Sequence, residues 1–111
     1  MIKKIGKLIR DNVPEIIAKD GGVAEVSILD DGKFKVSLKE KLVEETAEIA
    51  KSQDSTNLKE ELSDLLEIIE SIAGTEGSNL EEIIAIKKAK KVKVGGFDKK
   101  LYLVSVTRNE Q

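Results

Sequence analysis

Two apolar stripes at helical spacing, separated by a short polar segment, constrain the fold of this chain most strongly. The first predicts a helix over residues 33–51, and the second predicts another over residues 58–73. The apolar positions of the first stripe are Phe34, Leu38, Leu42 and Ile49. The polar segment 52–56 is so short that the two helices must run antiparallel as neighbours. The sequence therefore predicts a helical hairpin.

The N-terminal part predicts a shorter helix before this hairpin. It begins at residues 11–15, where the polar Asp11 fits a cap and Pro14 falls in the first turn, and it ends at Gly21-Gly22. The start of the 33–51 helix has two alternatives. Asp31-Gly32 could turn a β-hairpin into residues 33–36, or Ser37 with Glu40 could form a capping box that starts the helix later. The helical stripe favours the start near residue 33.

Polar residues mark the borders of the C-terminal elements. Asn57 with Glu60 predicts a capping box for the second helix of the hairpin, and Ser78 with Glu81 predicts one for a third long helix that ends before Gly95. Residues 23–29 and 100–106 are β-branched and partly alternating, which predicts two short strands that pair.

The expected fold class is therefore mainly α. It is a helical hairpin or four-helix-bundle type with a small two-stranded β element, in a single domain over residues 1–111. The chain contains two Phe, one Tyr and no Trp, so its core must be aliphatic. No apolar run is long enough to span a membrane, and the basic start is not followed by the apolar segment of a signal peptide. We expect a cytoplasmic protein that does not interact with membranes.

The charges are unevenly distributed along the chain. Residues 40–82 carry thirteen acidic and three basic side chains, whereas residues 87–100 carry seven Lys and one Asp. A protein that binds a nucleic-acid polymer would be basic throughout, so this partner is not expected. An acidic block and a basic block suit a metal site beside a site for a smaller polyanion. Two unrelated solvated helix faces would give the same distribution.

The absence of two residue types narrows the chemistry. Without Cys, the chain forms no disulfide, zinc–thiolate site or thiol nucleophile, and without His it lacks the commonest general base and transition-metal ligand. Any metal must be held by oxygen, which points to Mg²⁺, Mn²⁺ or Ca²⁺, and four carboxylate ligands without His favour Mg²⁺ among these. A carboxylate is then the ordinary general base at neutral pH.

The two helices of the predicted hairpin carry matching acidic patterns. In each, one Glu falls inside the apolar stripe and a second acid lies beside it, one turn later. The four acids are Glu45, Glu48, Glu61 and Asp64. A core-facing carboxylate is costly unless it is paired or binds a cation, and the short connection brings the four to a similar height. The alternative is that a base such as Lys41 or Lys59 neutralises them.

Four ordered motifs resemble the all-α nucleoside triphosphate pyrophosphatases, the MazG-like superfamily. The acidic pattern EE-x-x-E, twelve residues, E-x-x-D carries that likeness, and the remaining motifs are similar to the phosphoribosyl-ATP pyrophosphohydrolase-like branch. The motifs are KLIRDNVPEII at 7–17, KLVEETAEI at 41–49, EELSDLLEII at 60–69 and GGFDKKLYL at 95–103. The resemblance implies a helical fold with small strand additions. It also implies a homodimer, homotetramer or larger oligomer, and cleavage of a nucleotide between its α- and β-phosphates.

The resemblance also implies roles for individual residues. The Mg²⁺ ligands would be Glu45, Glu48, Glu61 and Asp64. Glu44 and Glu60 match the leading acids of the two patterns, and they would support the ligands together with Glu67, which stands where other branches often have Asn. Lys99 and Lys100 match a basic pair that could hold phosphates, whereas Val94 stands where the branch often has Arg.

These residues suffice for a metal-dependent hydrolysis. Glu48 or Glu45 is the expected carboxylate that orients the attacking water, and both are therefore candidate catalytic residues. Arg10 could reach a phosphate, as could lysines of the 87–100 segment, although charge at a helix C-terminus explains most of those lysines equally well. Two other functions fit the same fold. They are the phosphoribosyl-ATP pyrophosphohydrolase of histidine biosynthesis and a non-catalytic helical interaction or regulatory module.

Overall fold

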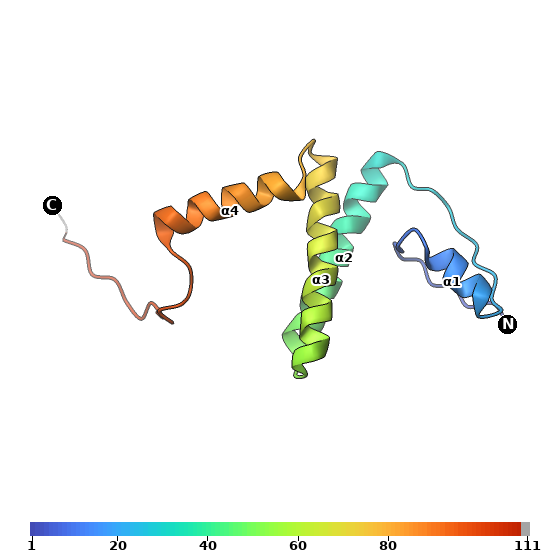
Figure 1. Ribbon diagram of the computed structural model, residues 1–111, viewed down its shortest axis with the longest axis horizontal. Coiled ribbons are helices and arrows are strands. Elements are labelled where there is room, and N and C mark those ends of the chain that lie inside the picture. The colour runs from blue at the N-terminus through green and yellow to red at the C-terminus, as the bar shows by residue number, and fades with distance from the viewer. Residues whose placement is uncertain (110–111) are drawn as a thin grey trace. The chain divides into compact units, whose positions relative to one another are not determined.

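The computed structural model describes residues 1–109, and in that range the chain forms four α helices and no strand (Figure 1). The prediction of a mainly α protein is confirmed. The helices are α1 (Val13–Lys19), α2 (Asp31–Lys51), α3 (Ser55–Thr75) and α4 (Leu80–Val94). The chain divides into two compact units, residues 1–80 and the part from residue 81 onward. Whether residues 1–111 form a single domain stays a prediction.

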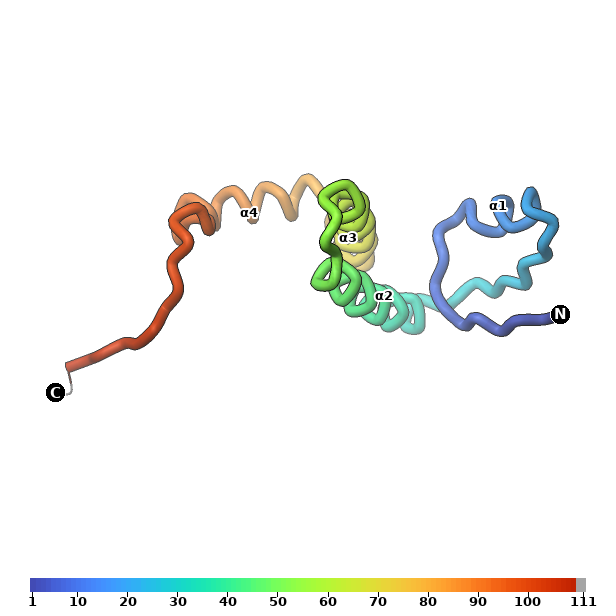
Figure 2. The backbone as a smooth tube through the Cα atoms, turned by 90° about the horizontal axis from the view of Figure 1, so that it is seen from below, coloured from blue at the N-terminus to red at the C-terminus, as the bar shows by residue number. Residues whose placement is uncertain are grey.

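Helices α2 and α3 form the predicted antiparallel hairpin, and they lie side by side in both views (Figures 1 and 2). The connection is shorter than predicted, residues 52–54, because α3 begins at Ser55. Leu38 of α2 and Ile68 and Ala73 of α3 are the buried apolar residues of this hairpin. The aliphatic stripes therefore face each other, as their helical spacing predicts.

The starts of both hairpin helices differ from the predicted capping boxes. Asp30 caps α2, because its Oδ1 accepts a hydrogen bond of 2.9 Å from the Lys33 N–H, so neither the hairpin turn nor the later start at Ser37 is formed. Asp54 caps α3 by accepting a bond of 3.2 Å from the Thr56 N–H. The capping box of Asn57 with Glu60 is wrong. Asp30 and Asp54 have extended backbone directly before the helices, and Asp caps a helix as well as Ser or Asn does. Each helix therefore begins earlier than the predicted capping box.

The cap of α2 leads to a testable prediction. Asp30→Ala removes the acceptor for the Lys33 N–H, so the free energy of unfolding should fall by about 1 kcal/mol in urea titrations. Asp30→Asn is the matched control, because Asn caps as well as Asp and should retain most of the stability. Equal stabilities for the Ala and Asn variants would contradict the assigned cap.

Helix α1 belongs to the N-terminal segment of the first unit. Pro14 lies in its first turn, as predicted, but Asn12 rather than Asp11 occupies the capping position and makes no side-chain cap. Asp11 as a cap is therefore wrong. The helix ends at Lys19, just before the predicted Gly21-Gly22. The positive φ of 88° at Gly21 lets the chain reverse, and the Gly22 N–H donates to the Ile17 carbonyl at 3.0 Å.

The two predicted strands are not formed in the described chain. Residues 23–29 and 100–106 have no regular secondary structure, and Ile28, for example, is fully exposed. The segments belong to different units, and a β-branched segment forms a strand only when a partner satisfies its backbone groups. The alternating pattern of each segment predicted its ability to form a strand, but neither segment has a paired strand within residues 1–109.

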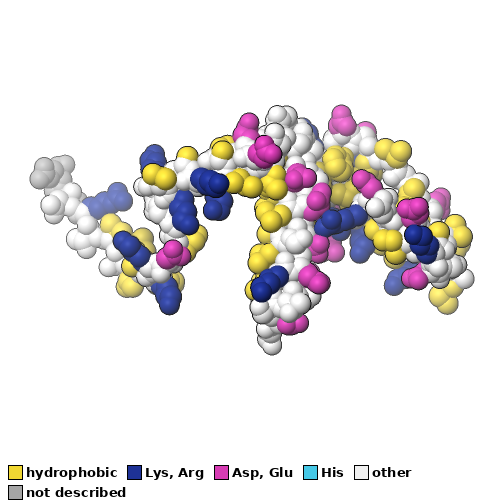
Figure 3. Space-filling model, in the orientation of Figure 1, with side chains coloured by type: hydrophobic (Ala, Val, Ile, Leu, Met, Phe, Trp, Pro, Cys, Tyr) yellow, Lys and Arg dark blue, Asp and Glu magenta, His cyan; other side chains and the backbone are white. Residues whose placement is uncertain are grey.

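The second unit contains most of α4 and the residues that follow it. The prediction that this helix ends before Gly95 is confirmed, and the Gly95 N–H donates to the Lys91 carbonyl at 2.8 Å. Hydrophobic and lysine side chains both lie open on the surface of α4 (Figure 3). Among the described residues, no helix is long and apolar enough to cross a membrane.

Candidate acidic site

The acids of α2 and α3 take up the two positions that the helical spacing predicts. Glu45 and Glu61 are half-buried at the seam between the helices, whereas Glu48 and Asp64 are exposed beside it. The antiparallel hairpin places Glu48 and Glu45 about one and two turns before the connection, and Glu61 and Asp64 about two and three turns after it. Acids on different helices, thirteen to nineteen residues apart in sequence, thus share the part of the hairpin near its connection.

The neighbouring acids change the pKa of Glu45. Burial at the seam raises the pKa of Glu45, and the carboxylates of Asp64 and Glu61 raise it further. Lys41, one turn earlier on α2, lowers this pKa, and Glu48 adds a smaller rise. Glu45 is therefore the acid that experiences the combined negative potential of the other three.

Two of the four acids already have partners. The guanidinium Nη2 of Arg10 lies 2.8 Å from Asp64 Oδ1, and the Asn57 side chain donates to Glu61 Oε1 at 2.9 Å. The other oxygen of Glu61, Oε2, is buried and has no hydrogen-bond partner among the described residues. The predicted alternative, neutralisation by a base, is thus realised at Asp64 by Arg10, which comes from a different segment.

The donor set fits a hard divalent cation. Four carboxylates supply the oxygen ligands that Mg²⁺ prefers, and the partnerless Glu61 Oε2 is an oxygen that a cation would satisfy. Within residues 1–109, no three acidic side chains lie close enough together to hold an ion as they stand. Arg10 and Asn57 each hold one of these acids, Asp64 and Glu61 respectively. A bound cation would need these acidic side chains to move closer together.

A groove of about 490 Å³ runs beside the acids within the first unit. The N-terminal segment forms one wall with Arg10, Asn12 and other residues, and α2 and α3 form the other with Phe34, Lys41 and Glu67 among its residues. Its lining combines apolar residues such as Leu38 and Ile68 with charged ones such as Arg10 and Lys41. Because Lys41 influences Glu45 and Arg10 binds Asp64, the charged end of this groove adjoins the acidic site.

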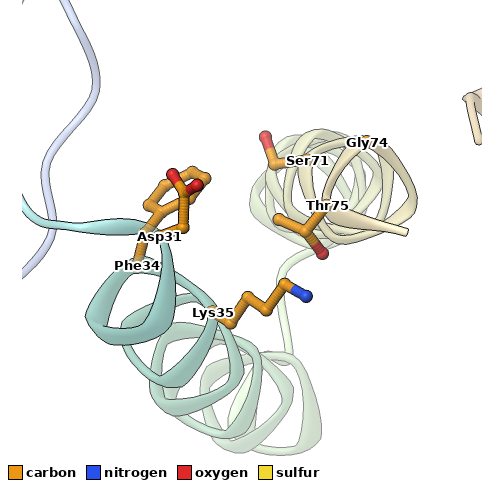
Figure 4. Close-up of a pocket in the computed structure, with 6 residues that line it drawn as sticks. All are labelled: Asp31, Phe34, Lys35, Ser71, Gly74 and Thr75. Carbon is orange, nitrogen blue, oxygen red and sulfur yellow. The ribbon is translucent and has the colours of Figure 1, made fainter. Parts of the chain in front are cut away.

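A second cavity, of about 500 Å³, lies between the start of α2 and the end of α3 (Figure 4). Lys35 extends across it toward α3, and its Nζ lies 3.8 Å from Glu76 Oε1. Its other polar side chains are Asp31, Ser71 and Thr75. Of the described residues that line the cavity, only Asp31 is acidic and only Lys35 is basic. The cavity therefore lacks the several carboxylates of the acidic site.

The remaining predicted residues lie in several places. Glu44 and Glu60 are exposed on α2 and α3, and Glu67 is exposed at the groove. Lys99 and Lys100 belong to the second unit, where the Lys100 N–H donates to the Phe97 carbonyl at 3.0 Å. Both lysines are exposed, and their contribution to phosphate binding stays a prediction. The sequence did not reveal the role of Asn57, although its position four residues before Glu61 was an available signal.

Comparisons with protein-family models, with curated protein sequences and with solved structures give no significant match to this chain.

Proposed function

We propose that the protein is a Mg²⁺-dependent nucleotide pyrophosphohydrolase, which cleaves a nucleoside triphosphate or a related nucleotide between its α- and β-phosphates. The observation that carries this proposal is the coupling of Glu45 with Asp64, Glu61 and Glu48 across the α2–α3 seam. In a chain without His or Cys, four carboxylates on facing helices suit Mg²⁺, or Mn²⁺, better than any other common cofactor. The four sequence motifs that resemble the MazG-like superfamily support the same activity.

The metal ion would be held by Glu45, Glu48, Glu61 and Asp64. When bound, it would neutralise phosphate charge and lower the pKa of a water molecule. Glu48 or Glu45 accepts a proton from the attacking water, whose oxygen forms a bond to phosphorus. The bond between this phosphorus and the oxygen that bridges the α- and β-phosphates then breaks. The bridging oxygen keeps the electron pair and leaves with the other product. The products are the nucleoside monophosphate and pyrophosphate, and the proton passes from the carboxylate to solvent.

The groove beside the acids would take the nucleoside part of the substrate. Phe34 contributes apolar surface, while Asn12 and Glu67 offer hydrogen-bonding groups for a base or a sugar. Lys41 and Arg10 lie where this groove meets the acids, which is the place for phosphates. Lys99 and Lys100 are further candidates for phosphate contacts, and Glu44 and Glu60 for orienting the metal ligands.

The proposal includes a cytoplasmic homodimer or homotetramer as the working form. Its support is the amount of apolar side chain that α2, α3 and the flanking segments expose in one copy. The segments 23–29 and 100–106 would gain their two-stranded pairing only in such an assembly, where a second chain supplies the missing backbone partners.

A nucleotide panel tests the proposed activity. Pyrophosphate release should require Mg²⁺ or Mn²⁺, and an excess of chelator should remove the metal-dependent activity because the site has no other cofactor. Undiminished turnover in excess chelator would contradict the metal site. Cleavage of phosphoribosyl-ATP alone would identify the histidine-biosynthetic enzyme, and no cleavage of any nucleotide would favour a non-catalytic module.

A further inference from the structure

Arg10 and Asp64 form the ion pair that connects the N-terminal segment to the acidic site. Their atoms are 2.8 Å apart, although the residues are 54 positions apart in sequence. Both side chains are about half exposed, at 53% and 51%. An exposed pair of this kind contributes little to stability, so it is held weakly enough for another ligand to replace it.

The backbone at Arg10 is held by a hydrogen bond at the start of α1. The Arg10 carbonyl accepts a hydrogen bond of 3.1 Å from the Val13 N–H at the start of α1, which anchors the peptide in a turn. The long side chain beyond this anchor lines the groove as well as contacting Asp64. A rotation of the side chain alone would therefore move the guanidinium from Asp64 into the charged end of the groove.

We propose that Arg10 is a displaceable counter-ion of the acidic site. Without a divalent cation it neutralises Asp64, and when a cation takes Asp64 the guanidinium is released to bind a phosphate oxygen of the nucleotide. This inference rests on the proposed function, because it needs both the metal and the phosphate. The guanidinium group is suited to the exchange, since its planar set of donors binds carboxylate and phosphate with the same geometry.

The two roles predict opposite effects of one substitution. Arg10→Gln removes the competitor for Asp64, so Mn²⁺, used as the probe without nucleotide, should bind about threefold to fivefold more tightly. The same variant should lose a phosphate contact, so the KM for the nucleotide should rise by about tenfold or more while kcat changes less. Arg10→Lys keeps the charge without the planar fork, and its Mn²⁺ affinity should stay near that of the original protein.

Lys35→Gln is the matched control. It removes one positive charge from a different ion pair, in which Lys35 Nζ lies 3.8 Å from Glu76 Oε1, and should leave both Mn²⁺ affinity and KM unchanged. Mn²⁺ binding can be measured by calorimetry on the full chain, after circular dichroism has shown equal helix content for all variants. This measurement does not depend on turnover.

The outcomes separate this inference from the proposed function. Tighter Mn²⁺ binding by Arg10→Gln together with a higher KM supports both roles of Arg10. Unchanged or weaker Mn²⁺ binding by this variant, beside clear binding by the original protein, overturns the inference and leaves the proposed metal site intact. If the original protein binds no Mn²⁺ at millimolar concentration, the inference and the proposed function both fail.

Discussion

Replacing Glu45 by Gln should reduce nucleotide hydrolysis by at least a hundredfold and leave the metal-free protein as stable as before, or more stable. Gln keeps the shape of the side chain but removes the charge that Asp64 and Glu61 oppose across the seam. The gain in the free energy of unfolding should be about 0.5–1 kcal/mol, since the seam is only half-buried and solvent screens part of the repulsion. Glu61→Gln should lose activity for the same reason.

The pH dependence of this gain follows from the direction of the pKa shift. Burial and the neighbouring carboxylates raise the pKa of Glu45 above its ordinary value of 4.5, so the folded protein binds the proton more tightly than the unfolded chain. The ionised form therefore lowers stability above the folded pKa. This cost disappears as the pH falls below 4.5, where both states are protonated. The advantage of Glu45→Gln should be complete at about pH 7 and absent at about pH 4.

Thermal melts with and without Mg²⁺ measure these effects independently of any substrate. Mg²⁺ should raise the Tm of the original protein and raise that of Glu45→Gln much less. Glu40→Gln provides a control, because Glu40 is exposed on the same helix but lies outside the acidic site. If Glu45→Gln lowers stability and leaves the Mg²⁺ shift unchanged, the carboxylate is a structural partner and the central proposal is wrong.

At micromolar concentration the protein should sediment as a homodimer or homotetramer. Helix α2 exposes Val43 at 69%, and α3 exposes Leu66 at 49%, so the hairpin retains apolar faces that a single chain does not cover. Figure 3 shows such side chains lying open along α3. Soluble monomers rarely leave contiguous apolar surface exposed, and helical hairpins commonly cover it by pairing.

A charge on either face tests the assembly. Val43→Glu or Leu66→Glu should shift sedimentation toward the monomer and lower the Tm, because the charge would be buried in the interface. Lys59→Glu, which changes an exposed charged position of α3, should leave the assembly unchanged. A stable monomer of the original protein at micromolar concentration would contradict this prediction, and the exposed faces would then need another partner.

The sequence predicted those parts of the structure that depend on local pattern. The periodicity of the stripes places α2 and α3, and it also places Glu45 and Glu61 at the seam with Glu48 and Asp64 beside it. Helix caps were predicted less well, because several polar residues compete for the first turn. The cap of α3 is therefore Asp54 and not the predicted Asn57.

Features that join distant segments could not be predicted in the same way. The contact between Arg10 and Asp64 joins the N-terminal segment to α3, and no periodicity links these two positions. The predicted strands at 23–29 and 100–106 failed for a related reason, since alternation identifies a segment able to pair but does not identify its partner. In the acidic site, the pattern predicted where the acids lie on the two helices but not that Asn57 and Arg10 would contact two of them.

The short connection between α2 and α3 also has a consequence for how the chain folds. Closing a loop over residues 52–54 costs little chain entropy, and helices joined so closely form contacts of low sequence separation, which favours rapid folding. Docking of Arg10 on Asp64 closes a far longer loop and is entropically more costly. The hairpin should therefore bring its acids together before their counter-ion arrives, so that mutual repulsion of carboxylates opposes the earliest packing step of this chain.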